Sequence, residues 1–291
     1  MSQLKPNDTR LSRFVPFGLG GQTKPHHYRE MLGALWENKT ELSYAWNILN
    51  HGVCDGCSLG PYGLKDNVHE GVHLCTTRLK LLKLNTMSAL DVSVMSDVNR
   101  LRRLRQEKLR ALGRIPHPML RRRGEKGFTR ITWDKAVELT TRSIRNAPPN
   151  QIAFFATSRG LTNEVYYVFQ KLARALGTNN VDLCSLLCHA ASDSGLKATL
   201  GNSAPTCSLS DFIGTEMLVI FGSDLANNQP VTAKYMHFAK QQGTRIIVVN
   251  PMREYGLERY WVPSVLESAL FGTRLADHWY DVHTGGDLAF L

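Results

Sequence analysis

A strand, a helix and a second strand follow one another near the end of the chain, and they constrain the fold more than any other feature of its 291 residues. Residues 217–221 and 245–249 are mostly apolar runs of strand length that contain several β-branched side chains. Between them, residues 231–242 form a predicted helix that Pro230 opens and Gly243 closes. This order and spacing predict parallel pairing through a right-handed crossover. The sequence therefore predicts an α/β fold with a parallel sheet.

The residues before this unit continue the same pattern. Residues 151–157 are predicted as a buried strand, and residues 163–176 as a helix that ends at Gly177. Residues 133–146 are predicted as a further helix, and residues 128–132 as the second strand of a hairpin. Strands and helices thus alternate over the second half of the chain.

Two parts follow from this organisation. We expect a Rossmann-like cofactor-binding domain over residues 131–291, preceded by an irregular region with three cysteines over residues 1–130. The longest uncharged apolar runs, such as 217–221 and 246–249, are far shorter than a membrane span of ~20 residues. Residues 1–21 contain no signal-peptide core and no adjacent arginine pair. We therefore expect a cytoplasmic protein without a membrane span.

The positive charge is confined to one stretch. Lysine and arginine number 35 against 25 aspartates and glutamates, and residues 100–130 contain twelve basic and two acidic residues, so the rest is neutral. A nucleic-acid surface running over the whole chain is therefore disfavoured. Residues 97–112 predict one amphipathic helix with a solvated basic face or a subunit contact. An acidic partner or nucleic acid bound by the stretch from Arg100 to Arg123 is the alternative.

Three of the six cysteines lie in a glycine-rich segment. Cys54 and Cys57 form a CxxC pair, and 17 residues separate Cys57 from Cys75. This spacing suits an iron–sulfur cluster, a zinc ion with His69 or His73 as the fourth ligand, or reduced thiols without a metal. Cysteines in a cytosolic chain favour metal binding or catalysis over disulfides.

A second group comprises Cys184, Cys188 and His189. We expect a helix over residues 190–200, which places Cys188 just before its N-terminus, where the helix dipole stabilises a thiolate. Cys188 is then a candidate nucleophile or metal ligand, and His189 a candidate acid or base near neutral pH. A buried, unreactive thiol is the alternative.

The loops after the predicted strands share a composition suited to ligand binding. They read SRGLTNE, GSDLANNQP and NPMREYG, and they offer amides and charge without bulk. In open parallel sheets, ligands bind at the carboxyl ends of the strands. Neither GxGxxG nor GxxxxGK[ST] occurs, so the common dinucleotide and P-loop fingerprints are absent from the sequence.

These loops, the run NNVDLCSLLCHAASDSGL and the segments IIVVNPMREYGLERYWVP and GGDLAFL resemble the molybdopterin oxidoreductases of the formate dehydrogenase type. The resemblance covers about residues 28–291 and is strongest to the alpha-subunit branch with three N-terminal cysteines. It implies an oxidoreductase that holds molybdenum or tungsten in bis(molybdopterin guanine dinucleotide), together with a [4Fe-4S] cluster. Formate is the preferred substrate, and an electron-acceptor protein or subunit is the expected partner.

The resemblance also assigns residues. Cys188 would ligate the metal, His189 would act beside it, Cys54, Cys57 and Cys75 would bind the cluster, and Lys80 would lie between cluster and pterin. The residues expected to cradle the cofactor come from four loops: Ser158, Arg159, Asn163, Glu164, Gly222, Asn227, Pro230, Asn250, Pro251, Arg253, Gly286 and Asp287.

The sequence departs from the family pattern in two ways. Pro61 stands where the four-cysteine form has a cysteine, so the fourth iron would need Asp66, His69, His73 or a small molecule. The sequence also stops after GGDLAFL, where family members continue, so a fragment is expected. The rival hypothesis is a non-catalytic zinc-loop protein that binds acidic partners or nucleic acid.

Overall fold

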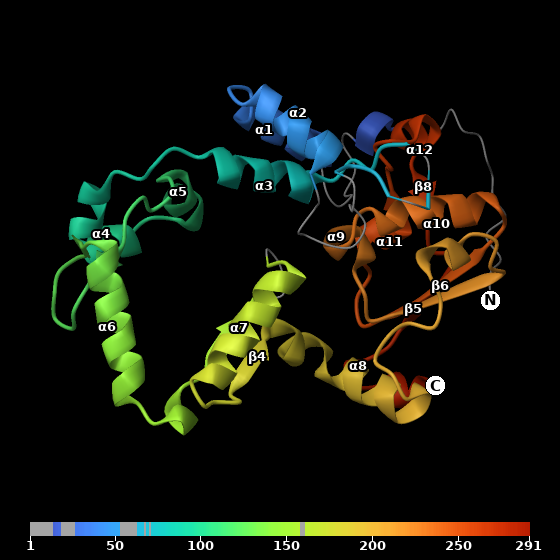
Figure 1. Ribbon diagram of the computed structural model, residues 1–291. Helices are drawn as coiled ribbons and strands as arrows, with labels where there is room; N and C mark the ends of the chain where they lie inside the picture. Colours follow the sequence, from blue (N-terminus) through green and yellow to red (C-terminus); the bar gives the residue numbers. More distant parts are fainter. Residues whose placement is uncertain (1–13, 19–26, 53–62, 67, 70, 158–160) are drawn as a thin grey trace. The chain divides into compact units, whose positions relative to one another are not determined.

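The computed structural model describes residues 14–18, 27–52, 63–66, 68–69, 71–157 and 161–291 (Figure 1). They form two compact units, which we call the terminal unit (residues 1–82 and 204–291) and the middle unit (residues 83–203). These units reflect packing alone, so the predicted functional division at residue 130 stays a prediction.

The terminal unit contains a three-stranded parallel sheet. Its strands are β5 (Met217–Phe221), β6 (Arg245–Asn250) and β9 (His278–Asp281), in the order β5-β6-β9. Met217 pairs with Arg245, and Ile247 pairs with His278. The predicted parallel pairing of the first two strands is confirmed. Because all three strands are parallel, the loops that follow them leave the sheet at one edge.

The core of the terminal unit lies between this sheet and the elements that cross over it. Helix α10 (Thr232–Gln241) contributes Met236, which is fully buried with Ile246 and Val248 of β6. After β6, the cluster is completed by Leu257 of α11 (Tyr255–Glu258) and Tyr260 of β7 (Arg259–Tyr260). Strand β7 pairs antiparallel with β8 (Thr273–Arg274), and α12 (Leu266–Phe271) lies between these two strands in the sequence. β6 is the central strand of this sheet, and its Ile246 and Val248 side chains are fully buried in this cluster.

Three helices from the start of the chain form a second small core in the same unit. They are α1 (His27–Glu37), α2 (Leu42–His51) and α3 (Thr76–Thr86). Met31, Ala45, Leu79 and Leu82 pack together in this core. The start of the described chain is also tied to the later part of the unit, because Trp261 Nε1 donates to the Val15 carbonyl at 2.8 Å.

The middle unit has its own parallel strand pair. It consists of β3 (Phe154–Ala156) and β4 (Val181–Leu183), joined by α7 (Asn163–Ala175). The predicted helix is confirmed, with Gly177 at φ +81° after its end. The predicted buried strand is shorter than expected and only partly buried, since Phe155 is 60% exposed.

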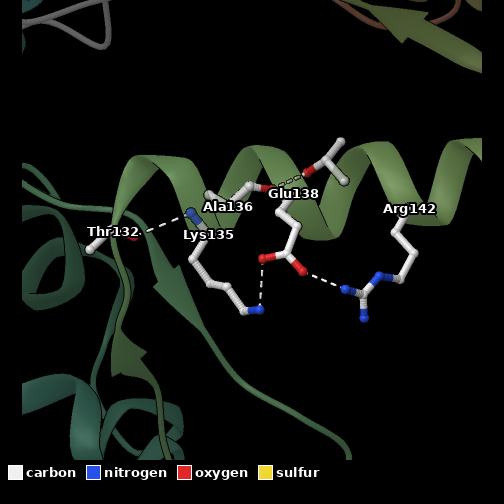
Figure 2. Close-up of polar contacts among 6 residues, drawn as sticks. Thr132, Lys135, Ala136, Glu138 and Arg142 are labelled. Carbon is white, nitrogen blue, oxygen red and sulfur yellow. Dashed lines mark hydrogen bonds and ion pairs between the residues drawn. The ribbon is translucent and has the colours of Figure 1, made fainter.

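The start of the middle unit contains the predicted hairpin and helix. Strands β1 (Met119–Leu120) and β2 (Thr129–Arg130) pair antiparallel, which confirms the hairpin, and α6 (Trp133–Asn146) follows. Figure 2 shows the Thr132 hydroxyl accepting a hydrogen bond from the Lys135 backbone N–H at 3.2 Å. It also shows Glu138 paired with Lys135 and Arg142 along the exposed helix surface.

The single basic helix predicted over residues 97–112 is wrong. The stretch forms two short helices, α4 (Val98–Arg102) and α5 (Gln106–Ala111), which are interrupted at residues 103–105. Arginines at 100, 102, 103 and 105 place like charges at helical spacings, which disfavours a continuous helix. Leu104 and Leu109 are more than one-third exposed, so little packing opposes the break.

Among the residues that the structure describes, no helix combines the length and the apolar character needed to cross a membrane.

Candidate functional site

The loops after β5 and β6 are joined by the Asn250 side chain. The Ser223 backbone N–H donates to Asn250 Oδ1, and Asn250 Nδ2 donates to the Ser223 carbonyl, both at 3.2 Å. Gly222 precedes this contact with φ +55°, and a Cβ there would meet no atom within 4 Å. Asn250 is itself 3% exposed. The edge thus combines a fixed polar clamp with open space beside a glycine.

The loop after β5 continues into the short helix α9 (Leu225–Asn228). Asp224 caps it by accepting from the Asn227 backbone N–H at 3.3 Å, and the Asn227 side-chain amide also donates to Asp224. Asn227 Oδ1 is buried, and no described residue hydrogen-bonds to it. Pro230 is half-buried just before α10. An unpartnered buried carbonyl oxygen at a sheet edge suits a ligand that donates a hydrogen bond.

The remaining two predicted loops also leave the sheet at this edge. After β6, Pro251 and Arg253 are exposed, and Arg253 Nη1 lies 3.5 Å from Glu258 Oε1. After β9, Gly286 and Asp287 begin the short helix α13 (Asp287–Phe290). Eight predicted cofactor residues therefore come from three loops of one sheet, namely Gly222, Asn227, Pro230, Asn250, Pro251, Arg253, Gly286 and Asp287.

The structure corrects the local prediction for Cys188. Helix α8 (Cys184–Leu200) begins at Cys184 directly after β4, so Cys188 lies in the second helical turn. Its thiol donates to the Cys184 carbonyl at 3.5 Å, and both Cys188 and His189 are exposed. The argument that a helix N-terminus stabilises a Cys188 thiolate is therefore wrong. Its proposed role as a metal ligand is a separate prediction that the geometry leaves untested.

Other predicted residues of the middle unit lie at the start of α7. Asn163 and Glu164 are exposed in its first turn, and Thr162 caps it by accepting from the Val165 N–H at 3.5 Å. A hydrogen bond with the Thr162 side chain lowers the pKa of Glu164. Ser158 and Arg159 lie outside the described residues.

A hollow of about 580 Å³ lies at the ends of the two strands of the middle unit. Its lining is mainly apolar and aromatic with a few polar groups, and includes Ala156, Tyr166, Gln170, Asp182, Leu183 and Ser185. Ala156 and Leu183 are the last residues of β3 and β4. A concave surface at the carboxyl ends of parallel strands is where α/β folds bind ligands.

The N-terminal cysteine site is described only in part. Cys54 and Cys57 lie outside the described residues, whereas Cys75 is a half-buried free thiol just before α3. Lys80 is exposed on α3. Within the described ranges, no group of three or more histidines, cysteines or carboxylates is arranged to hold a metal.

A buried polar cluster formed by Asp66, His69, His73, Lys234 and Tyr235 lies next to Cys75. His73 Nε2 lies 2.6 Å from Asp66 Oδ2, the Tyr235 hydroxyl donates to the same oxygen, and Lys234 Nζ donates to the Val72 carbonyl at 3.2 Å. The sequence had singled out the first three residues. It missed Lys234 and Tyr235, for which the only signal is a lysine inside the helix that crosses over the sheet.

The charges of the buried polar cluster follow from its burial. Burial and the neighbouring Lys234 lower the pKa of His73, although Asp66 opposes that shift. Burial also lowers the pKa of Lys234. Burial opposes ionisation of Asp66, but hydrogen bonds from the His69 N–H and Tyr235 hold its pKa below the ordinary value. Burial therefore disfavours the protonated form of His73, while the hydrogen bonds to Asp66 favour its ionised form.

Comparison with known proteins places the chain among oxidoreductases. Residues 114–290 match the family model described as molybdopterin oxidoreductase. An uncharacterized oxidoreductase of Mycobacterium tuberculosis is 33% identical over 180 residues, which are 62% of this chain and 23% of that protein. The alpha subunit of an F420-dependent formate dehydrogenase of Methanococcus maripaludis is 40% identical over 139 residues, 47% of this chain and 20% of that protein.

Protein YdeP of Escherichia coli is 31% identical over 187 residues, which are 63% of this chain and 24% of that protein. The matched part of the chain thus spans less than a quarter of the length of these three relatives.

Proposed function

This chain belongs to the molybdopterin oxidoreductase family, and on that premise we propose that it forms the N-terminal part of a formate-dehydrogenase-like catalytic subunit. The observation that carries the proposal is the family match over residues 114–290, which includes the three loops at one edge of the β5-β6-β9 sheet. The name of the Methanococcus relative supports formate as the substrate.

The loops at the sheet edge would hold bis(molybdopterin guanine dinucleotide). The fit is supported by the buried, unpartnered Asn227 Oδ1 and by the open space at Gly222. Amides and guanidinium groups such as that of Arg253 suit a ligand with phosphates and a purine base. When bound, this cofactor with its molybdenum or tungsten supplies two-electron redox chemistry. The family resemblance also assigns Ser158, Arg159, Asn163 and Glu164 to this cofactor.

Two exposed residues of α8 would act at the metal. Cys188 would supply a thiolate ligand, and the adjacent His189 would orient the substrate or take up its proton near neutral pH. Exposure of both side chains supports this role, because a ligand or a base must be reachable by its partner.

Cys54, Cys57 and Cys75 would bind a [4Fe-4S] cluster that passes electrons on singly to an acceptor protein or subunit. Lys80 would lie between the cluster and the pterin. The half-buried free thiol of Cys75 and the unpartnered ring nitrogen of the nearby His73 support a metal at this place. A cytoplasmic location belongs to the same proposal.

Metal analysis of the protein separates this proposal from its rival. Iron with labile sulfide and a brown absorbance supports the cluster. Stoichiometric zinc, together with salt-sensitive binding of polyanions, would support the non-catalytic zinc-loop protein instead.

The role of Cys188 is tested by formate-dependent reduction of an artificial electron acceptor. In the whole protein that contains this sequence, Cys188→Ala should abolish turnover and leave the iron content unchanged, because the two metal sites use different ligands. Cys188→Ser is the sharper comparison, since a hydroxyl is nearly isosteric but a poorer ligand for a soft metal. His189→Ala should lower turnover by ~100-fold or more without releasing the metal. The exposed Cys207 provides the control Cys207→Ala. Full activity in Cys188→Ala would overturn the assignment.

A further inference from the structure

The excess positive charge of the chain lies in one exposed stretch of the middle unit, residues 98–130, which we call the basic surface. It contains twelve basic and two acidic residues, whereas the rest of the chain has 23 of each sign. All twelve basic side chains are exposed. Like charges gathered in this way repel one another and oppose folding, so their concentration suits a partner that neutralises them.

The basic surface is held together as one piece. Asp97 Oδ2 lies 3.8 Å from Arg100 Nε of α4 and 3.3 Å from Lys126 Nζ, which follows the turn of the hairpin. The backbones of the two segments are also in close contact, because a Cβ at Gly127 would meet the Ser96 carbonyl oxygen at 2.1 Å. The arginines of α4 and those of the hairpin therefore belong to one structure.

Several arginines of this surface have no internal partner. Glu125 is paired with Arg122 at 3.4 Å. Between α4 and α5, Arg103 and Arg105 form no ion pair and no side-chain hydrogen bond with any residue that the structure describes. Their guanidinium groups are therefore available to an external anion, and this planar group matches a carboxylate with two parallel hydrogen bonds.

Apolar side chains are exposed among these charges. Leu104, which lies between the two unpaired arginines, is 38% exposed, Leu109 of α5 is 39% exposed, and Ile115 is 59% exposed. The basic residues are also ten arginines and only two lysines. Protein interfaces are enriched in arginine and depleted in lysine, and their centres are apolar. The composition of the basic surface therefore favours a protein as its partner.

A nucleic acid fits the basic surface less well. Single strands bind by stacking their bases on aromatic side chains, and the only phenylalanine, tyrosine or tryptophan in residues 98–130 is Phe128, which is half-buried. Helix α5 has six residues and so a length of ~9 Å, which is shorter than the ~12 Å width of the major groove. A second copy of the chain fits no better, because the remaining residues have no net negative charge.

We propose that the basic surface docks an acidic protein, whose carboxylates pair with Arg103, Arg105 and their neighbours while its apolar side chains contact Leu104 and Leu109. The inference goes beyond the function proposed above and does not depend on its cofactors. An electron-acceptor protein with an acidic face meets this description. Metal content still separates the oxidoreductase from its rival, whatever the basic surface binds.

The test measures binding of two fluorescent peptides of about 20 residues to the whole protein that contains this sequence, by fluorescence anisotropy. One peptide consists of glutamate alone, and the other has leucine at every fourth position. Both should bind at low salt and dissociate as the salt concentration rises, and the peptide with leucine should bind more tightly.

The variants locate the binding. Arg103→Glu combined with Arg105→Glu should weaken both peptides by about tenfold or more. Leu104→Ser should weaken only the peptide that contains leucine. The matched control combines Arg145→Glu on α6 with Lys171→Glu on α7, which are exposed and change the net charge equally, and it should have little effect.

Two outcomes would overturn the inference. One is tighter binding of a single-stranded or duplex nucleic acid of about 20 nucleotides at the same salt concentration, which would assign the basic surface to nucleic acid instead. The other is the absence of peptide binding, or equal weakening by the charge-reversal variant and its control. If the charge-reversal variant fails to fold, Arg103→Gln combined with Arg105→Gln provides the same comparison with a smaller change of charge. Either outcome leaves the oxidoreductase proposal intact, because metal content and formate turnover are measured separately.

Discussion

The side-chain amide of Asn250 forms two hydrogen bonds with the backbone of Ser223, both at 3.2 Å. Its oxygen accepts from the Ser223 N–H, and its nitrogen donates to the Ser223 carbonyl. Its backbone carbonyl also accepts from the Val282 N–H at 3.2 Å, so one residue links the chain segments that follow β5, β6 and β9. The proposed cofactor cradle is therefore organised before any ligand binds, which lowers the cost of ordering these loops on binding.

Asn250→Ala removes both side-chain bonds and leaves the Ser223 N–H and carbonyl without these partners. We expect the free energy of unfolding to fall by about 1–3 kcal/mol. Urea unfolding followed by circular dichroism measures it. The exposed Asn228 supplies the control Asn228→Ala, which should change stability little. Equal stability of the two variants would show that the Asn250 clamp contributes nothing.

Tyr235→Phe removes one donor from the buried Asp66 carboxylate. Because hydrogen bonds to charged groups are stronger than neutral ones, we expect a loss of about 1.5–3 kcal/mol in the free energy of unfolding. Asp66→Ala should cost more, since it deprives both Tyr235 and His73 of their partner. The control is Tyr280→Phe, at a tyrosine that is 41% exposed. A Tyr235→Phe variant as stable as Tyr280→Phe would contradict the prediction.

Thr132→Ala removes the side-chain cap of α6 and should destabilise the protein by about 1 kcal/mol, measured by chemical unfolding. Thr140→Ala is the matched control on the same helix, because its hydroxyl donates to the Ala136 carbonyl at 2.8 Å within the helix. That bond adds little, and alanine is the better helix former, so stability should stay constant or rise. The prediction fails if the two variants are equally destabilised.

His237 should make the protein less stable in acid. Burial lowers the pKa of its imidazole from the ordinary value of 6.5; Glu267 opposes this shift, and Lys234 adds to it. Below about pH 6.5 the unfolded chain therefore binds a proton before the folded chain does, and stability falls by up to about 1.4 kcal/mol per pH unit. Above about pH 7.5 this group contributes almost no slope.

His237→Gln should flatten the stability profile between about pH 7.5 and pH 5.5, measured by urea unfolding at each pH. His69 and His73 also have lowered pKa values and keep their own contributions, so part of the slope remains. His283→Gln, at an exposed histidine, is the control and should leave the slope unchanged. An unaltered profile in His237→Gln would refute the assignment.

The parallel sheet was predictable because its evidence is local. The runs at 217–221 and 245–249 have strand composition, and Pro230 and Gly243 mark the ends of the helix between them. The ends of α6 were predictable for the same reason, with Thr132 as its cap. These features depend on residues only a few positions apart.

The start of α8 and the buried polar cluster were not predictable in this way. Helix α8 begins at Cys184 straight from a strand, and its cap residue Leu183 makes no side-chain hydrogen bond, so the usual start signal is missing. The contact between Asp66 and Tyr235 joins residues 169 positions apart. No periodicity or cap residue encodes such a pairing, because it arises only when the tertiary structure forms.

The 169 positions between Asp66 and Tyr235 also determine when the two residues can meet during synthesis of the chain. Translation adds roughly 5–20 residues per second, so Tyr235 is polymerised ~10–30 s after Asp66. Before Tyr235 is synthesised, Asp66 lacks the hydrogen bond from its hydroxyl, and His73 lacks the contact with its ring. The buried polar cluster is therefore expected to form only after α10 has been synthesised.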